Sequence, residues 1–188
     1  MKKIIMFTTI CMIAISSFAQ EPELSRREMR KLERELRKQQ KAEEAARKSE
    51  IVHQMVHHGR FVLEAERMRD KEGNTEIVSP TINFVAADSV SGILQIGSYN
   101  YVGLNGVGGI TEEGPISSYE YSLNKRNGNY YVTYQLRTTT DTYNITMTVY
   151  PEGRADATVS SSWPGQLYYM GTLVSPSSSR VYKGTTRY

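Results

Sequence analysis

Apolar and polar residues alternate along almost the whole segment from Ile116 to Val174. Successive side chains of a β-strand point to opposite faces, so alternation with a period of two predicts strands with one buried and one solvated face. The chain is therefore expected to build a mainly β domain. The residues expected to face inward are Tyr130, Val132, Tyr134, Leu136, Tyr143, Ile145, Met147, Val149, Ala155, Ala157, Val159, Leu167, Tyr169 and Leu173.

Short turn motifs separate these strands at regular intervals. They are Asn127-Gly128, Asp141-Thr142, Pro151-Glu152-Gly153 and Trp163-Pro164-Gly165. Such short connections favour antiparallel neighbours. Three earlier strands are predicted around Phe61–Ala65, Ile82–Ala86 and Val90–Ile96. The expected fold is α+β and mainly β, an antiparallel meander sheet of about seven or eight strands that is curled or barrel-like.

The segment from Glu21 to about His58 contains mostly Ala, Glu, Lys, Arg, Leu and Gln, with no Gly or Pro after Pro22. These residue types favour helix, and Ser25 is a suitable N-terminal cap. A long charged helix is therefore predicted here, before the β domain.

The first part of this helix has little apolar surface. Met29, Leu32 and Leu36 share one face, but their repeat lasts about one heptad, whereas a coiled coil needs three or four. We interpret residues 20–46 as a charged helical tether. The alternative is a partner-binding helix that uses those three apolar residues.

The second part of the helix is more apolar and is expected to cover an open side of the sheet. Gly59 offers a C-terminal cap, after which the β-rich domain continues, so this domain is placed at residues 47–174. The apolar face is formed by Ala42, Ala45, Ala46, Ile51, Val52, Met55 and Val56.

The N-terminus has the three parts of a secretory signal peptide. Lys2 and Lys3 give it a positive start, an apolar stretch follows, and Ser17-Phe18-Ala19 fits the cleavage pattern of small residues. Residues 1–19 are therefore predicted to be removed on export, to the periplasm or the extracellular space. No transmembrane segment is expected in the mature chain, and its only cysteine, Cys11, leaves with the signal.

The charge balance argues against nucleic acid as a partner. The formal charge of +3 falls to +1 when Lys2 and Lys3 are removed. The segment from Gln20 to Glu50 holds ten basic and eight acidic side chains. Without a basic excess, neither nucleic acid nor an anionic membrane is expected to bind.

The least regular part of the chain lies between Gly97 and Pro115, where glycines are frequent. We predict a recognition loop here, because loops on a rigid sheet commonly carry binding. The alternative is a loop that folds back and plugs one end of the sheet. The residues proposed for recognition are Tyr99, Tyr101, Leu104, Gly106, Gly108 and Gly109. Residues 175–188 are rich in Ser and Thr and are predicted to form a flexible tail.

Sequence motifs that would indicate catalysis or the binding of a metal or cofactor are weak in this chain. His53 and His57 are spaced to share a metal on a helix, but no third ligand accompanies them, so contacts with the helix end are favoured. The glycines lack the context of a phosphate loop, and a wide β-loop is favoured. Glu112 and Glu113 are adjacent on a predicted loop, and neighbouring residues on a strand face opposite ways, so they make a poor carboxylate pair. No catalytic residue, metal or cofactor is predicted.

Tyrosine is concentrated in the β-rich part: all 13 tyrosines follow residue 98. Inward-facing tyrosines either fill a small core with their hydroxyls at its rim or line a cavity for a ligand. The core interpretation is favoured. The tyrosines concerned are Tyr119, Tyr121, Tyr130, Tyr134, Tyr143 and Tyr169.

Several segments together resemble a known family. They are Phe61–Met68, Gly108-Gly109-Ile110, Pro115-Ile116 and the stretch from Tyr143 to Gly153. They resemble the domain-of-unknown-function 4251 family of secreted Bacteroidota proteins, over about Arg47 to Val174. The resemblance implies a β-rich domain in the periplasm or on the cell surface, and it implies no activity.

The expected function is non-enzymatic binding in the cell envelope, to an unknown envelope protein or a small ligand. The closest alternative is a lipocalin-like carrier, and an envelope hydrolase is the third. A carrier needs a cavity of roughly a few hundred Å³, an enzyme needs converging polar groups, and an interaction module needs an exposed apolar patch.

Overall fold

The computed structural model describes residues 25–98, 100, 103, 105–162 and 165–186. The predicted signal peptide and Tyr99, Tyr101 and Leu104 lie outside these residues. The elements in chain order are α2 (Arg26–His58), β1 (Arg60–Arg69), β2 (Thr75–Ile77), β3 (Phe84–Asp88), β4 (Ser91–Ile96), β5 (Ile110–Leu123), β6 (Tyr130–Arg137), β7 (Thr142–Val149), β8 (Arg154–Ser160) and β9 (Gln166–Val174).

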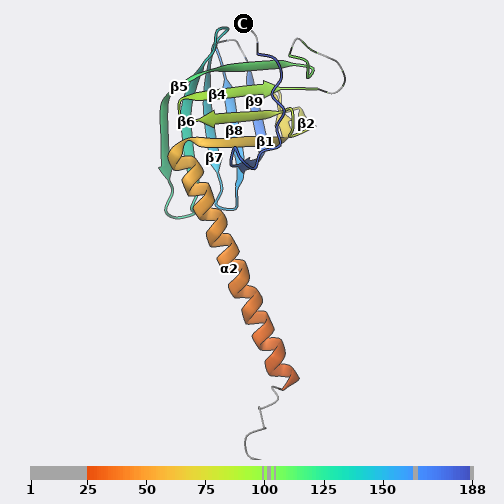
Figure 1. Ribbon diagram of the computed structural model, residues 1–188, viewed down its shortest axis with the longest axis vertical. Helices are drawn as coiled ribbons and strands as arrows, with labels where there is room; N and C mark the ends of the chain where they lie inside the picture. The colour runs from red at the N-terminus through yellow and green to blue at the C-terminus, as the bar shows by residue number, and fades with distance from the viewer. Residues whose placement is uncertain (1–24, 99, 101–102, 104, 163–164, 187–188) are drawn as a thin grey trace, which may run out of the picture. The chain divides into compact units, whose positions relative to one another are not determined.

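The strands form one antiparallel meander that closes into a barrel (Figure 1). From β3 to β9 each strand pairs with the next one along the chain. Closure comes from β1, which pairs with β3 along one edge and with β9 along the other, where Leu63 lies opposite Leu173. The short β2 extends the β3 edge of β1. The predicted mainly β fold, with a meander that curls into a barrel, is confirmed.

The predicted alternation places the core inside the barrel. Val132 and Ile145 are at most 1% exposed, whereas their neighbours Thr133 and Thr146 are exposed. Phe61, Leu63 and Ala65 of β1 are fully buried. Side chains of both halves of the sheet therefore meet in one interior, and a barrel of this strand number is just wide enough for them to fill.

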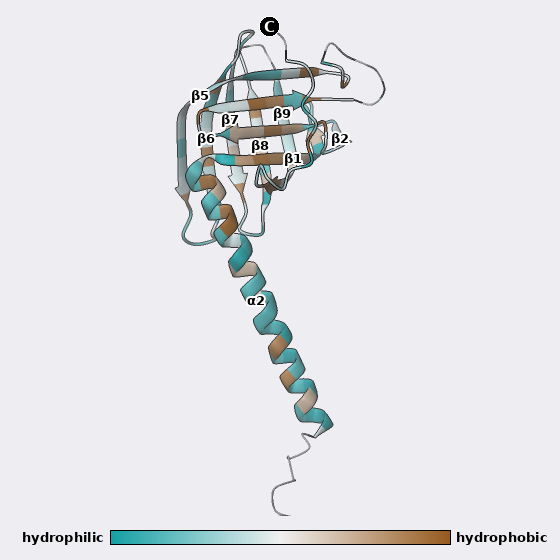
Figure 2. Ribbon diagram, viewed as in Figure 1, coloured by the Kyte–Doolittle hydropathy of each residue, from teal (hydrophilic) through white to brown (hydrophobic). Residues whose placement is uncertain are grey.

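The helix begins at Arg26, where the Glu28 carboxylate accepts a hydrogen bond from the Ser25 backbone N–H. Its last turns bury Val52, Met55 and Val56 in the barrel core. The packed face is smaller than predicted, because Ala42, Ala45, Ala46 and Ile51 are exposed. Figure 2 shows the helix as mainly hydrophilic. A compact unit with the barrel spans Glu44–Tyr188.

Hydrogen bonds tie the last turns of α2 to one end of the barrel. The Tyr119 hydroxyl donates a bond of 2.6 Å to the Val56 carbonyl, and the Tyr130 hydroxyl lies 2.8 Å from His53 Nδ1. Tyr119 is near the end of β5 and Tyr130 begins β6. The helix therefore covers the end of the barrel where β5 turns into β6, called the closed end below.

The segment expected to be irregular up to Pro115 is shorter than predicted. Strand β5 begins at Ile110, so residues 111–115 belong to the barrel wall and pair with β4. The prediction failed because Glu, Gly and Pro are poor strand formers by themselves, while the β4 edge supplies partners. Gly114 is required in this wall, since a Cβ there would lie 1.8 Å from the Arg137 carbonyl oxygen.

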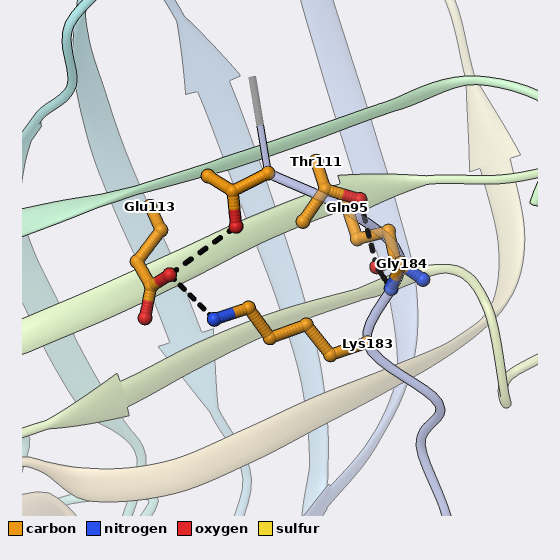
Figure 3. Close-up of polar contacts among 6 residues, drawn as sticks. Gln95, Thr111, Glu113, Lys183 and Gly184 are labelled. Carbon is orange, nitrogen blue, oxygen red and sulfur yellow. Dashed lines mark hydrogen bonds and ion pairs between the residues drawn. The ribbon is translucent and has the colours of Figure 1, made fainter. Parts of the chain in front are cut away.

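The C-terminal segment lies against the outer face of the barrel, which its composition did not indicate. Figure 3 shows the contacts: the Gly184 N–H donates to Gln95 Oε1, and Lys183 forms an ion pair with Glu113. Further back, the Arg180 N–H donates to the Glu64 carboxylate. The prediction of a flexible tail therefore does not hold for these residues. Composition could not indicate their contacts, because the partners lie far away in the sequence.

Candidate functional site

The end of the barrel opposite α2 holds a cavity of about 570 Å³. Its lining comes from the ends of several strands, including Ile96 at the end of β4, Ile110 at the start of β5 and Gln166 at the start of β9. In an antiparallel meander these termini meet at one end, which is the end away from the β5–β6 turn. We call this open end the barrel mouth.

The surface that faces the cavity is mainly apolar, although more than half of the lining residues are polar or charged. Polar groups include the hydroxyl of Thr140 and the carboxylates of Glu112 and Asp141. An apolar hollow with a few placed polar groups is typical of small-molecule sites. The apolar part is formed by Leu94, Ile96, Ile110, Tyr143, Val159 and Leu167.

Glu112 is the most unusual side chain in this lining. It is 3% exposed, its β4 partner is Leu94, and the Thr140 hydroxyl donates a bond of 2.7 Å to its Oε2. Glu113 lies on the outer face with Lys183. The expectation that the two glutamates face opposite ways is confirmed, although they lie on a strand and not on a loop.

Asp141 lies on the β6–β7 connection at the mouth. Its pKa is lowered, mainly because the Ser162 hydroxyl donates a hydrogen bond to the carboxylate, and the Thr142 N–H donates another. Its Oδ2 is buried and has no hydrogen-bond partner among the described residues. The carboxylate therefore remains ionised at neutral pH, and the Ser161 side chain contributes a further hydrogen bond that lowers its pKa.

The predicted recognition loop connects the two strands whose ends line the mouth. Gly106 and Gly108 have positive φ angles of 75° and 79°, which glycine adopts without strain. A Cβ on Gly109 would lie 2.2 Å from the Ile96 carbonyl oxygen. The three glycines thus shape this part of the connection, while recognition by the loop stays a prediction.

Asn105 organises the described part of that loop, and the sequence analysis missed it. Its Oδ1 accepts hydrogen bonds from the backbone N–H groups of Val107 and Gly109, and its Nδ2 donates to the Thr111 hydroxyl. Its carbonyl accepts a bond from the Thr185 N–H in the C-terminal segment. A lone Asn among glycines gives no sequence signal for this role, because its partners depend on the fold.

The tyrosines mostly fill the core, as the favoured interpretation held. Tyr130, Tyr134 and Tyr169 are at most 5% exposed, whereas Tyr121 is 39% exposed beside α2. Of the six inward-facing tyrosines named above, Tyr143 lines the cavity. The apolar part of the cavity is therefore formed mainly by aliphatic residues.

The histidines of α2 pair with these aromatic residues. His53 and His57 bond to the hydroxyls of Tyr130 and Tyr121, and the two imidazoles stack with ring centres 5.7 Å apart. Among the described residues, no group of three or more His, Cys, Asp or Glu side chains lies close enough together to hold a metal ion. The histidines thus help to hold the helix on the closed end.

No helix within the described residues combines the length and the apolar character needed to cross a bilayer.

The fold has a solved counterpart. A crystal structure of a DUF4251 family protein from Bacteroides eggerthii DSM 20697 matches with a TM-score of 0.60 and 24% identity, over 70% of this chain and 90% of that chain. At this identity the likeness concerns the fold alone. No functionally curated protein matches the chain significantly. The model of the family described as "Domain of unknown function (DUF4251)" matches residues 43–173, and the chain therefore belongs to the DUF4251 family.

Proposed function

We propose that this protein is a non-enzymatic binding protein that holds a small, largely apolar molecule in the barrel mouth. The observation that carries this proposal is the cavity of about 570 Å³ at the barrel mouth, because its volume is within the range of small-molecule sites. The fold is compatible with a lipocalin-like carrier: one end is covered by a helix and the other is hollow.

The composition of the mouth supports binding in preference to catalysis. Its described lining contains carboxylates, hydroxyls, the Lys71 ammonium, the Gln166 amide and apolar side chains, and no histidine or cysteine is among them. The Thr140 hydroxyl has a neighbouring carboxylate in Glu112, but nucleophilic catalysis also needs a third group that orients the base, and no further hydrogen bond to Glu112 is seen among the described residues. The envelope hydrolase is accordingly the weaker proposal.

The test uses a neutral apolar dye, Nile red, and two tryptophan substitutions at opposite ends of β5. Ile110→Trp would fill the mouth, whereas Leu123→Trp adds the same side chain beyond the cavity, where Leu123 is 44% exposed. We expect saturable dye fluorescence with the wild type and Leu123→Trp, and at least about tenfold weaker binding by Ile110→Trp. Equal binding by all three proteins, or none by the wild type, would contradict the proposal.

We also propose that the protein acts after export, in the periplasm or outside the cell. Lys2, Lys3 and the Ser17-Phe18-Ala19 motif support this location. Expression of the full chain in a Bacteroidota host, followed by N-terminal sequencing, should find a mature protein that begins at Gln20. An uncleaved chain in the cytoplasmic fraction would show that the proposal is wrong.

An envelope protein partner remains a second proposal. Met29, Leu32 and Leu36 are between 46% and 58% exposed and share one helix face. Replacing all three with serine and measuring capture of envelope proteins on the immobilised chain would test it, with the Nile red assay as the control for an intact barrel. Unchanged capture would count against a partner at this face.

A further inference from the structure

Glu112 is a carboxylate placed where an ordinary barrel has an apolar side chain. The position faces the interior, next to Leu94, and is 3% exposed. Burial of an ionised carboxylate is costly unless hydrogen bonds or an opposite charge compensate it. One hydroxyl, that of Thr140, donates to it, and no ion pair among the described residues involves it.

The other charged residues of the mouth are mainly acidic, like Glu112. Asp70, Glu72 and Asp141 also line the cavity, against the single base Lys71. With Glu112 this makes four acids and one base, a formal charge of −3. The Lys71 ammonium lies 3.6 Å from the Glu72 carboxylate, so it is already engaged there.

Asp141, one of these four acids, adds an observation about hydrogen bonding to the count of charges. Its Oδ2 is buried without a partner in the described part of the chain, although the carboxylate is held in the ionised form. A buried unpartnered acceptor is costly and calls for an explanation. A donor on a bound molecule would satisfy it.

We propose that the mouth selects an amphipathic cation: a molecule with an apolar body and a protonated amine, whose ammonium binds the Glu112 carboxylate. The aliphatic lining takes the apolar body, and the ammonium takes the place of the missing basic partner. The inference rests on the proposed binding function and adds the chemical class of the ligand.

The test compares three probes that share one chain and differ in the head group: octylamine, octanol and octanoate. Each is titrated against the complex of the full mature protein with Nile red, and dye displacement is measured at neutral pH. For the wild type we expect octylamine to compete at least about tenfold better than octanol, because hydrogen bonds to charged groups are worth more than neutral ones. Octanoate should be the weakest.

Two isosteric substitutions at consecutive positions of β5 test whether the inner carboxylate causes the amine preference, with the outer one as the control. Glu112→Gln keeps an acceptor for Thr140 but removes the charge, and it should bring octylamine to within about threefold of octanol. Glu113→Gln removes the outer carboxylate that pairs with Lys183 and should leave the amine preference unchanged. Should Glu112→Gln fail to fold, Asp141→Asn, at the more exposed position, is expected to reduce the preference as well.

The outcomes separate the two proposals. If octylamine and octanol displace the dye equally from the wild type, the cation proposal is overturned and the binding function stands. If no probe displaces the dye, the cavity is not the binding site and both fail. If calcium chloride alone abolishes the amine preference at low concentration, the acidic mouth is a metal site, and the amine proposal is overturned.

Discussion

The backbone N–H of Gly184 donates a hydrogen bond of 2.8 Å to the side-chain oxygen of Gln95, 89 residues earlier in the chain. The same side chain donates from its Nε2 to the Tyr182 carbonyl and accepts a bond from the Thr111 hydroxyl. Gln95 is fully buried although it lies on the outer face of the barrel. The C-terminal segment is therefore part of the structure of the β3–β5 wall.

Removal of residues 179–188 should lower the free energy of unfolding by about 3 kcal/mol. The deletion removes two hydrogen bonds of the Gln95 side chain, those to Tyr182 and Gly184, and uncovers Phe84, which lines a hollow beneath this segment with Val181. Urea denaturation measures the change. The control is Tyr182→Ala, which removes a side chain that is 66% exposed and keeps the backbone bonds. A loss below about 0.5 kcal/mol on deletion would support the flexible tail predicted from composition.

A shortened chain that starts at Arg47 should melt within a few degrees of the full mature chain. Residues 25–48 are exposed, and their ion pairs Arg37–Glu33 and Lys48–Glu44 are surface pairs of adjacent helical turns, worth about 0.3–0.5 kcal/mol each. Circular dichroism melts compare the two chains. A shortened chain that does not fold would show that the N-terminal helix is more than a tether.

A carboxylate placed on the inner face of a strand should destabilise the protein much more than one placed on the outer face. Val132→Asp should cost more than about 4 kcal/mol, because it buries an unpaired carboxylate among apolar side chains. Thr133→Asp, the next residue, should cost less than about 1 kcal/mol, because that side chain is exposed. Ile145→Asp and Thr146→Asp repeat the comparison in β7. Equal losses within a pair, measured by urea denaturation, would contradict a one-sided sheet.

The half-buried Tyr119 and the buried Tyr134 should respond differently to loss of the hydroxyl. Tyr119→Phe removes the bond to the Val56 carbonyl and should cost about 1 kcal/mol. The hydroxyl of Tyr134 is buried without a partner in the described residues, so Tyr134→Phe should be neutral or stabilising. Matched urea denaturation curves give both values. Destabilisation by Tyr134→Phe would mean that this hydroxyl has a partner, such as a bound water.

Stability should fall at alkaline pH. Burial raises the pKa of Tyr119, Tyr134 and Tyr169 above the ordinary value of 10.0. Because the folded pKa exceeds the unfolded one, their contribution is complete below pH 10.0 and is lost as the pH rises above it. Urea midpoints at increasing pH should therefore drop beyond about pH 10. Tyr182→Phe, at an exposed position, should follow the wild-type curve, and a flat profile would contradict the expected linkage.

Sequence alone predicted most of the strands and their inward faces, but not β2 or the first residues of β5. Val132, Ile145 and Ala157 could be placed correctly because the direction of a side chain on a strand depends on position parity, which is a local property. The same holds for the helix, whose residue types favour that backbone without help from the fold. The meander followed from the short turns, since these permit only antiparallel neighbours.

Tertiary structure alone decided what depends on pairing between distant segments. Closure by β1 and β9 joins residues such as Leu63 and Leu173, and no local pattern encodes that edge. Likewise, Glu112 was recognised as facing away from Glu113, but its position above a cavity depends on where the barrel ends meet. The burial of Gln95 could not be predicted either, because it depends on the C-terminal segment that covers this polar strand residue. Local patterns set the direction of each side chain, whereas its surroundings are set by contacts that the chain makes only after it closes.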